Sequence, residues 1–114
     1  MIKKIKINNI AIIDSLEFEL SNKLNIVTGE TGSGKSIIIK SIQYLKGSKF
    51  NKDDLRKGAD YASIEALALI NNKDIYLKRK ISKNFVSSFY IDNNKITFDE
   101  YSNIVSNNID IHNQ

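Results

Sequence analysis

Cysteine and proline are absent from this 114-residue sequence, and glycine occurs only five times. Without cysteine the chain cannot form a disulfide, a thiolate metal site or a cysteine nucleophile. Its single histidine, His112, excludes a metal site built from several histidines. No apolar stretch approaches the ~20 residues that a membrane-spanning helix needs, and lysines interrupt residues 1–7, where a signal peptide would be continuously apolar. We therefore expect a cytoplasmic protein with no membrane partner.

Charge is the second feature that narrows the function. The sequence carries 17 basic and 13 acidic residues, which gives a net charge of +4, and its pI is about 9.2. Lysines make up nearly all of the basic residues and are spread along the whole chain. A diffuse charge of this size neutralises few phosphates at once. It predicts at most weak, salt-sensitive association of this chain with DNA.

The length and the 41% apolar composition are those of one globular domain with its own core. Residues 2–7 and 16–20 alternate apolar and polar side chains, which predicts an antiparallel pair of strands. We predict a short third strand at 24–27, leading into three closely spaced glycines. No helix breaker occurs over 36–46, where apolar residues recur at helical spacing, and Gly47 stands where a helix usually ends.

The second half of the chain indicates an antiparallel meander and a short helix. We expect an irregular polar segment at 48–60. Three strand-like runs separated by short polar turns follow, at 62–70, 75–81 and 85–91. Residues 97–100 have the spacing of a capping box, which predicts a helix to about residue 105, and 109–111 indicate a further strand. The predicted fold class is α/β, with antiparallel strands flanking the strand and helix of the glycine cluster.

The glycine cluster contains the phosphate-binding motif G-x-x-x-x-G-K-[ST], the P-loop. A bound polyphosphate is wrapped by backbone N–H groups at close range, and glycine allows this approach because it has no Cβ. The helix that follows directs its free N–H groups and its positive dipole end to the same anion. Lys35 adds a full charge near the β- and γ-phosphates, and the hydroxyl of Ser36 is a suitable ligand for Mg²⁺. The predicted nucleotide-binding residues of the motif are Gly29, Glu30, Thr31, Gly32, Ser33, Gly34, Lys35 and Ser36.

Two strands before the loop and antiparallel strands after its helix distinguish this chain from the usual kinases and small GTPases. The arrangement resembles the nucleotide-binding heads of the ABC class. Within that class, residues 9–20 and 24–36 are similar to the start of the RecN family, the bacterial SMC-like DNA repair ATPases. Three later segments resemble the same family: Asp53–Ala59, Ser88–Asn93 and Asp110–Gln114. Asn113 departs from the family, which usually has glycine there. The resemblance covers essentially the whole chain.

The resemblance implies an ATP-binding protein that uses Mg²⁺ and acts in recombinational repair of DNA double-strand breaks. Residues 29–36 would hold the triphosphate and the metal. Gln114 matches the Q-loop glutamine, whose side-chain oxygen reaches the metal, and His112 beside it is expected to be a structural neighbour. Arg56 matches an arginine placed near the phosphates, although a solvated loop cation is an equal alternative. The family also implies head dimerisation, contact with DNA through the full assembly, and association with the nucleoid.

The parts that an ABC-type head needs for hydrolysis are not found in the sequence. These are an LSGG-type signature segment, an apolar strand ending in Asp-Glu (the Walker B aspartate and the catalytic glutamate), and a switch histidine. In the RecN family they follow a long coiled coil. We therefore expect 1–114 to be a single N-terminal lobe that arises as an excised piece, a split gene or a truncated reading frame. Such a lobe would hydrolyse ATP only with a C-terminal lobe, in cis or in trans.

Two other functions stay open at this point. The first alternative is a stand-alone P-loop module that binds nucleotide without turnover. The second is a DEAH-type helicase, which shares the sequence Gly-Glu-Thr-Gly-Ser-Gly-Lys. The strand pair before the loop argues against the helicase. The DNA downstream of codon 114 discriminates among these functions, because an open frame encoding heptads and an LSGG segment favours the RecN-like lobe.

Overall fold

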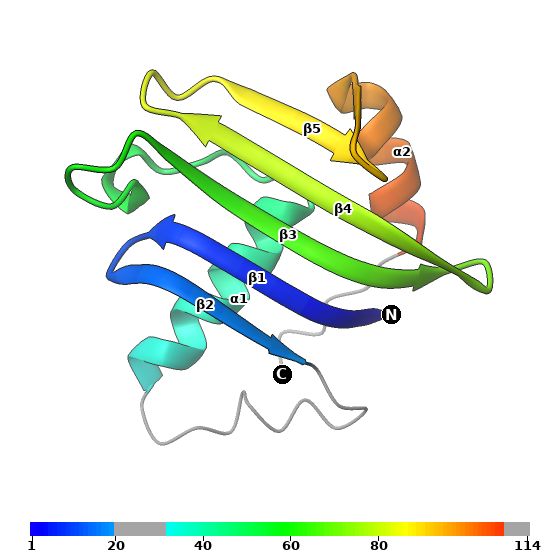
Figure 1. Ribbon diagram of the computed structural model, residues 1–114, viewed down its shortest axis with the longest axis horizontal. Helices are drawn as coiled ribbons and strands as arrows, with labels where there is room; N and C mark the ends of the chain where they lie inside the picture. Colours follow the sequence, from blue (N-terminus) through cyan, green and yellow to red (C-terminus); the bar gives the residue numbers. More distant parts are fainter. Residues whose placement is uncertain (20–31, 109–114) are drawn as a thin grey trace.

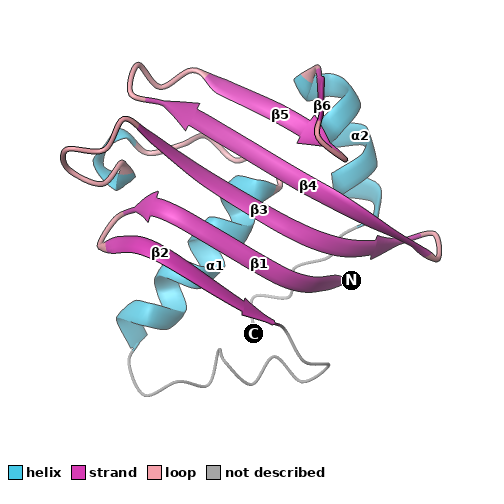
Figure 2. Cartoon of the chain, in the orientation of Figure 1, coloured by secondary structure: helices cyan, strands magenta, loops and turns pink. Residues whose placement is uncertain are grey.

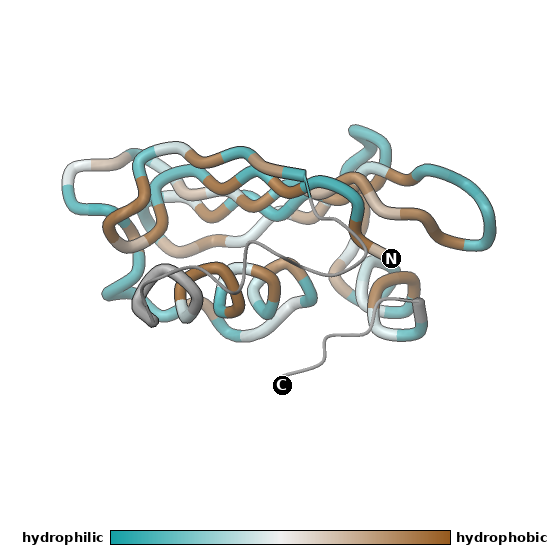
Figure 3. The backbone as a smooth tube through the Cα atoms, turned by 90° about the horizontal axis from the view of Figure 1, so that it is seen from below, coloured by the Kyte–Doolittle hydropathy of each residue, from teal (hydrophilic) through white to brown (hydrophobic). Residues whose placement is uncertain are grey.

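The computed structural model describes residues 1–19 and 32–108 and shows a six-stranded sheet with two α-helices on one of its faces (Figures 1 and 3). The strands are β1 (Ile2–Ile10), β2 (Ile13–Glu19), β3 (Tyr61–Ile70), β4 (Lys73–Ser82), β5 (Ser87–Ile91) and β6 (Asn94–Ile96). The helices are α1 (Gly32–Leu45), the short 3-10 helix η2 (Lys52–Asp54) and α2 (Phe98–Asn108). No described helix has both the length and the apolar character required to cross a membrane.

The sheet order is β2-β1-β3-β4-β5-β6, and all neighbouring strands are antiparallel (Figure 2). β1 therefore pairs with β2 on one side and with β3 on the other, although α1 and η2 lie between β2 and β3 in the sequence. The predicted antiparallel pair at the start of the chain and the predicted meander are both confirmed.

Two hairpin turns explain why the meander is so regular. Asn71 and Asn72 link β3 to β4 with φ values of 52° and 64°, and Asp92 and Asn93 link β5 to β6 with φ values of 49° and 68°. Two-residue hairpins favour turns with positive φ at both positions, and Asn and Asp tolerate this conformation better than most residues. The polar pairs in the sequence therefore set the strand register.

The core lies between the sheet and the helices because each strand directs alternate side chains to that face. On β3 these side chains are small at Ala62, Ala66 and Ala68, and α1 contacts this strand. From the helices, Leu45 of α1 and Tyr101 of α2 are completely buried. A single core therefore fixes both helices against the same face of the sheet.

α1 ends at a C-capping glycine, Gly47, as predicted. Gly47 has a φ of +112°, its N–H donates to the carbonyl oxygen of Tyr44 at 3.0 Å, and the N–H of Ser48 donates to that of Gln43 at 3.1 Å. These bonds satisfy carbonyls that the end of a helix would leave without partners. A residue with a Cβ rarely adopts this backbone conformation.

Gly47→Ala should lower the free energy of unfolding by about 1–3 kcal/mol. The φ is unfavourable for alanine, and the added Cβ would lie 2.7 Å from Cε1 of Phe98. Urea unfolding measures the loss. Gly58→Ala is the matched control, since Gly58 also has a positive φ, +86°, but nothing lies within 4 Å of its Cβ position. Equal losses for the two variants would show that the contact with Phe98 contributes nothing.

Other sequence predictions are confirmed or corrected in detail. The capping box is present, with the Glu100 N–H donating to Thr97 Oγ1 at 3.2 Å and the Thr97 N–H donating to Glu100 Oε1 at 3.1 Å. α1 begins at Gly32 and not at Ser36, because the second half of the motif is itself helical. The strand predicted from 85 begins at 87, and β6 was not predicted as a strand. The strands predicted at 24–27 and 109–111 lie outside the described residues.

Candidate functional site

The second half of the predicted P-loop forms the first turn of α1. Residues Gly32–Lys35 are helical, and Ser36 follows with an exposed side chain. The first N–H groups of a helix have no partner within the helix and carry its positive dipole end. The structure thus supplies the helix start that the motif requires. Gly29, Glu30, Thr31 and Gln114 lie outside the described residues, as does His112.

A lysine one turn further along α1 connects the helix to the segment before β3. Lys40 Nζ lies 2.9 Å from Asp54 Oδ2. Residues four apart share one face of a helix, so Lys40 is on the same face as Ser36 and about 6 Å further along the helix axis. The ion pair therefore joins the face of α1 that carries Ser36 to η2.

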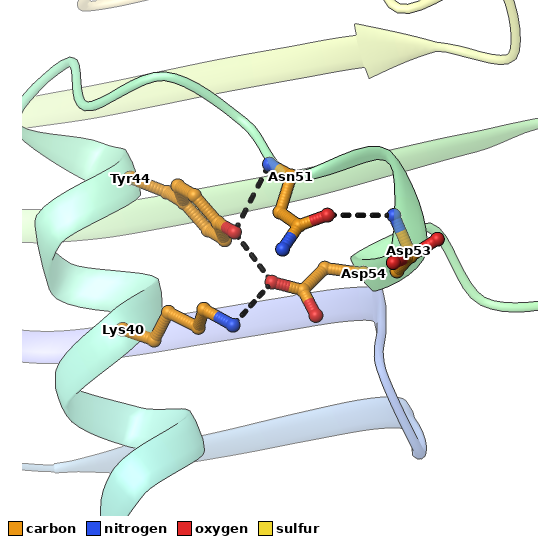
Figure 4. A network of polar contacts seen from close by, with 5 residues as sticks. All are labelled: Lys40, Tyr44, Asn51, Asp53 and Asp54. Atoms are coloured by element: carbon orange, nitrogen blue, oxygen red, sulfur yellow. Dashed lines mark hydrogen bonds and ion pairs between the residues drawn. The ribbon is translucent and has the colours of Figure 1, made fainter.

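Tyr44, another turn along, completes this contact (Figure 4). Its hydroxyl donates to Asp54 Oδ2 and accepts the N–H of Asn51 at 3.1 Å. Burial, together with the bond to Asp54, raises the pKa of Tyr44, so the phenol stays protonated as a donor. The bond to Asp54 raises the pKa of Lys40. We call Lys40, Tyr44 and Asp54 the α1–η2 network.

The same segment is also attached to the turn between β1 and β2. The Ala11 N–H donates to the Asp54 carbonyl oxygen at 2.7 Å, and the Arg56 N–H donates to that of Asn9 at 3.0 Å. An isolated bridge pairs Ile10 with Leu55. The Arg56 side chain is exposed. The segment that contains Arg56 is thus attached both to the turn between β1 and β2 and to the face of α1 on which Ser36 lies.

The opposite end of α1 is anchored by two buried polar side chains. Arg79 of β4 is 5% exposed; its Nη1 donates to the carbonyl oxygens of Tyr44 at 2.8 Å and Ser48 at 2.5 Å, and its Nε donates to Ser87 Oγ at 3.1 Å. The Tyr101 hydroxyl donates to the Leu45 carbonyl oxygen at 2.6 Å. Desolvation lowers the pKa of Arg79 and raises that of Tyr101. A cation at a helix C-terminus also opposes the negative end of the dipole.

Two of the chain's carboxylates have structural partners in the described residues. Asp54 belongs to the α1–η2 network, and Glu100 belongs to the capping box of α2. Within residues 1–19 and 32–108, no group of three or more His, Cys, Asp or Glu side chains is arranged to hold a metal ion.

Sequence reasoning missed Arg79 and the α1–η2 network. For Arg79 a signal existed, because in β4 it has the same parity as Leu77 and Ile81, and all three are buried on the helix side. Asp54 has no comparable signal. Its neighbours Asp53 and Lys52 are exposed, and its burial depends on Tyr44, ten residues earlier.

The chain has relatives of known family. The AAA domain family matches residues 4–114. The DNA repair protein RecN of Rickettsia prowazekii is 34% identical over 86 residues, which cover 75% of this chain and 15% of that protein. RecN of Vibrio cholerae is 28% identical over 130 residues, covering 100% of this chain and 24% of that protein. This chain therefore spans less than a quarter of the length of either relative.

Solved structures share the fold. An SMC ATPase structure, from work on ATP-driven dimerization and DNA stimulated activation of SMC ATPases, aligns with a TM-score of 0.79 at 19% identity, covering 92% of this chain and 77% of that one. At this identity the likeness establishes the fold alone, and it confirms the predicted α/β lobe of an SMC-type head. Since the family match extends over residues 4–114, the chain belongs to the AAA domain family and is similar to the N-terminal head lobe of RecN.

Proposed function

We propose that this chain is the ATP-binding N-terminal lobe of a RecN-like ATPase that acts in recombinational repair of DNA double-strand breaks. In this proposal residues 1–114 form one lobe, and a C-terminal lobe in cis or in trans supplies the rest of the head. Two such heads would dimerise, and DNA would be bound through the full assembly.

The observation that carries the proposal is the start of α1 inside the P-loop motif. A helix N-terminus at Gly32–Lys35 provides N–H donors and a positive dipole for phosphate oxygens. The exposed Ser36 provides a hydroxyl for Mg²⁺, which prefers oxygen ligands. This donor set fits a magnesium nucleotide. The bound metal would neutralise phosphate charge, while the motif orients the phosphates.

The relatives support the biological part of the proposal. Those reported above are named DNA repair protein RecN, and the SMC ATPase that shares the fold is described as dimerising in an ATP-driven way. The roles of Arg56 at the phosphates and of Gln114 at the metal rest on the resemblance to the RecN family. We propose both as nucleotide-site residues alongside Gly29–Ser36.

Magnesium-dependent ATP binding by the purified chain tests the proposal. Lys35→Ala should weaken binding by at least ~2 kcal/mol, or about 30-fold, because a charge-assisted contact to phosphate is lost. Isothermal titration calorimetry with and without Mg²⁺ measures this. The charge-matched control is Lys49→Ala, at an exposed position beyond the far end of α1, and it should bind as the wild type does.

The outcomes separate the proposal from its alternatives. Equal affinity of the wild type and Lys35→Ala would contradict the nucleotide site itself. Binding that depends on Lys35 but gains no turnover from a C-terminal lobe would favour a stand-alone P-loop module instead.

A further inference from the structure

Arg56 lies on a short segment whose backbone is held from two sides. Toward the sheet, Asp54 and Arg56 exchange backbone hydrogen bonds with Ala11 and Asn9, which lie at the turn between β1 and β2. Toward α1, the Asp54 side chain contacts Lys40 and Tyr44. The two attachments fix the segment that carries Arg56 between the sheet and the helix.

The segment is attached to α1 through a buried carboxylate and not through apolar side chains. Asp54 is 8% exposed, and burying a carboxylate has a large desolvation cost unless it is paired and hydrogen-bonded. Here a full positive charge from Lys40 and a phenol from Tyr44 meet the same oxygen, Oδ2. Side chains of this kind specify one arrangement of the segment more sharply than apolar contacts do, because their hydrogen bonds are directional.

The α1–η2 network also places the Arg56 segment relative to the start of α1, where the candidate phosphate site lies. Lys40 lies on the same face of α1 as Ser36, the last residue of the P-loop motif, and one turn after it. Arg56 is two residues beyond Asp54, which is at most about 7 Å of extended chain. The α1–η2 network therefore determines where the Arg56 backbone stands relative to the start of α1.

We propose that Asp54 is a positioning residue which, through Lys40 and Tyr44, fixes the Arg56 backbone relative to α1 so that the Arg56 guanidinium meets the phosphates of a bound nucleotide. This inference rests on the proposed function and extends it to residues outside the motif. Asp54 itself touches no phosphate, and its effect on binding passes through Arg56.

A double-mutant cycle between Asp54 and Arg56 tests the inference, with MgATP affinity measured by calorimetry. Arg56→Ala should weaken binding about tenfold. Asp54→Asn should weaken it by about three- to tenfold, and the double variant should bind no more weakly than Arg56→Ala alone. Asp53→Asn is the matched control at the exposed neighbouring position, and it should leave affinity unchanged.

The cycle separates positioning from a general structural effect. If Asp54→Asn weakens binding by the same factor in the presence and absence of Arg56, the residue acts independently of Arg56 and the inference is wrong. An unchanged affinity of Arg56→Ala would also overturn it. Failure of the proposed function is distinct, since the wild type itself would then show no Lys35-dependent binding.

Tyr44→Phe keeps the inference testable if Asp54→Asn does not fold. This variant removes only the hydroxyl and retains the ring, whose centroid lies 4.7 Å from that of Phe50. It should weaken MgATP binding severalfold in the wild-type background and not at all with Arg56→Ala. Thermal unfolding of each variant verifies that the folded protein is being compared.

Discussion

Arg79→Met should lower the free energy of unfolding by about 3 kcal/mol or more. Methionine can occupy much of the same space, but the carbonyl oxygens of Tyr44 and Ser48 and the hydroxyl of Ser87 lose their donor in a buried place. Buried acceptors without partners each cost about 1–3 kcal/mol. The positive charge at the C-terminal end of α1 is lost as well. Urea unfolding followed by circular dichroism gives the difference.

Two further variants show whether the guanidinium geometry accounts for the loss. Arg79→Lys keeps the charge but has no planar fork to reach three acceptors, so its stability should lie between those of the wild type and Arg79→Met. Lys73→Met changes the charge at an exposed position of the same strand and should stay within about 0.5 kcal/mol of the wild type. A loss below about 1 kcal/mol for Arg79→Met would contradict the anchoring role.

The parts of the fold that could be predicted are those that a few neighbouring residues in the sequence determine. The turn at Asn71-Asn72, the end of α1 at Gly47 and the capping box at 97–100 each depend on a few adjacent residues whose conformational preferences agree. The P-loop motif likewise predicted a helix start, and the helix is present from Gly32. Short-range physical chemistry was enough for all of these.

The parts that were missed depend on contacts between distant segments. Arg79 is buried because the register of β4 places it under the end of α1, 35 residues away from Tyr44 in the sequence. Asp54 is buried because η2 folds onto α1 and onto the turn at Ala11. The parity of Arg79 with Leu77 and Ile81 indicates that it is buried but not which groups it contacts. Asp54 has no sequence pattern of its own, so residues 48–60 were expected to be irregular and polar, although they contain the anchor of the Arg56 segment.

The isolated chain should bind ATP without sustained turnover, and a C-terminal head lobe should raise the rate by on the order of 100-fold or more. Lys35, Ser36 and Arg56 are proposed to contact the bound ground state. Hydrolysis also requires a positioned water and donors that stabilise the transferring phosphoryl group. Affinity for the ground state alone does not accelerate the chemical step. A second lobe that brings a catalytic carboxylate and a signature segment would complete the site.

Phosphate release from MgATP by the purified chain, alone and with the separately expressed C-terminal lobe of the same head, tests the central claim most directly. Lys35→Ala is assayed in parallel, since activity that survives this substitution comes from a contaminant. The proposed function predicts no sustained release by the chain alone and release that appears with the second lobe and disappears in Lys35→Ala. Sustained turnover by the chain alone that Lys35→Ala abolishes would contradict it, because the chain would then contain its own catalytic carboxylate.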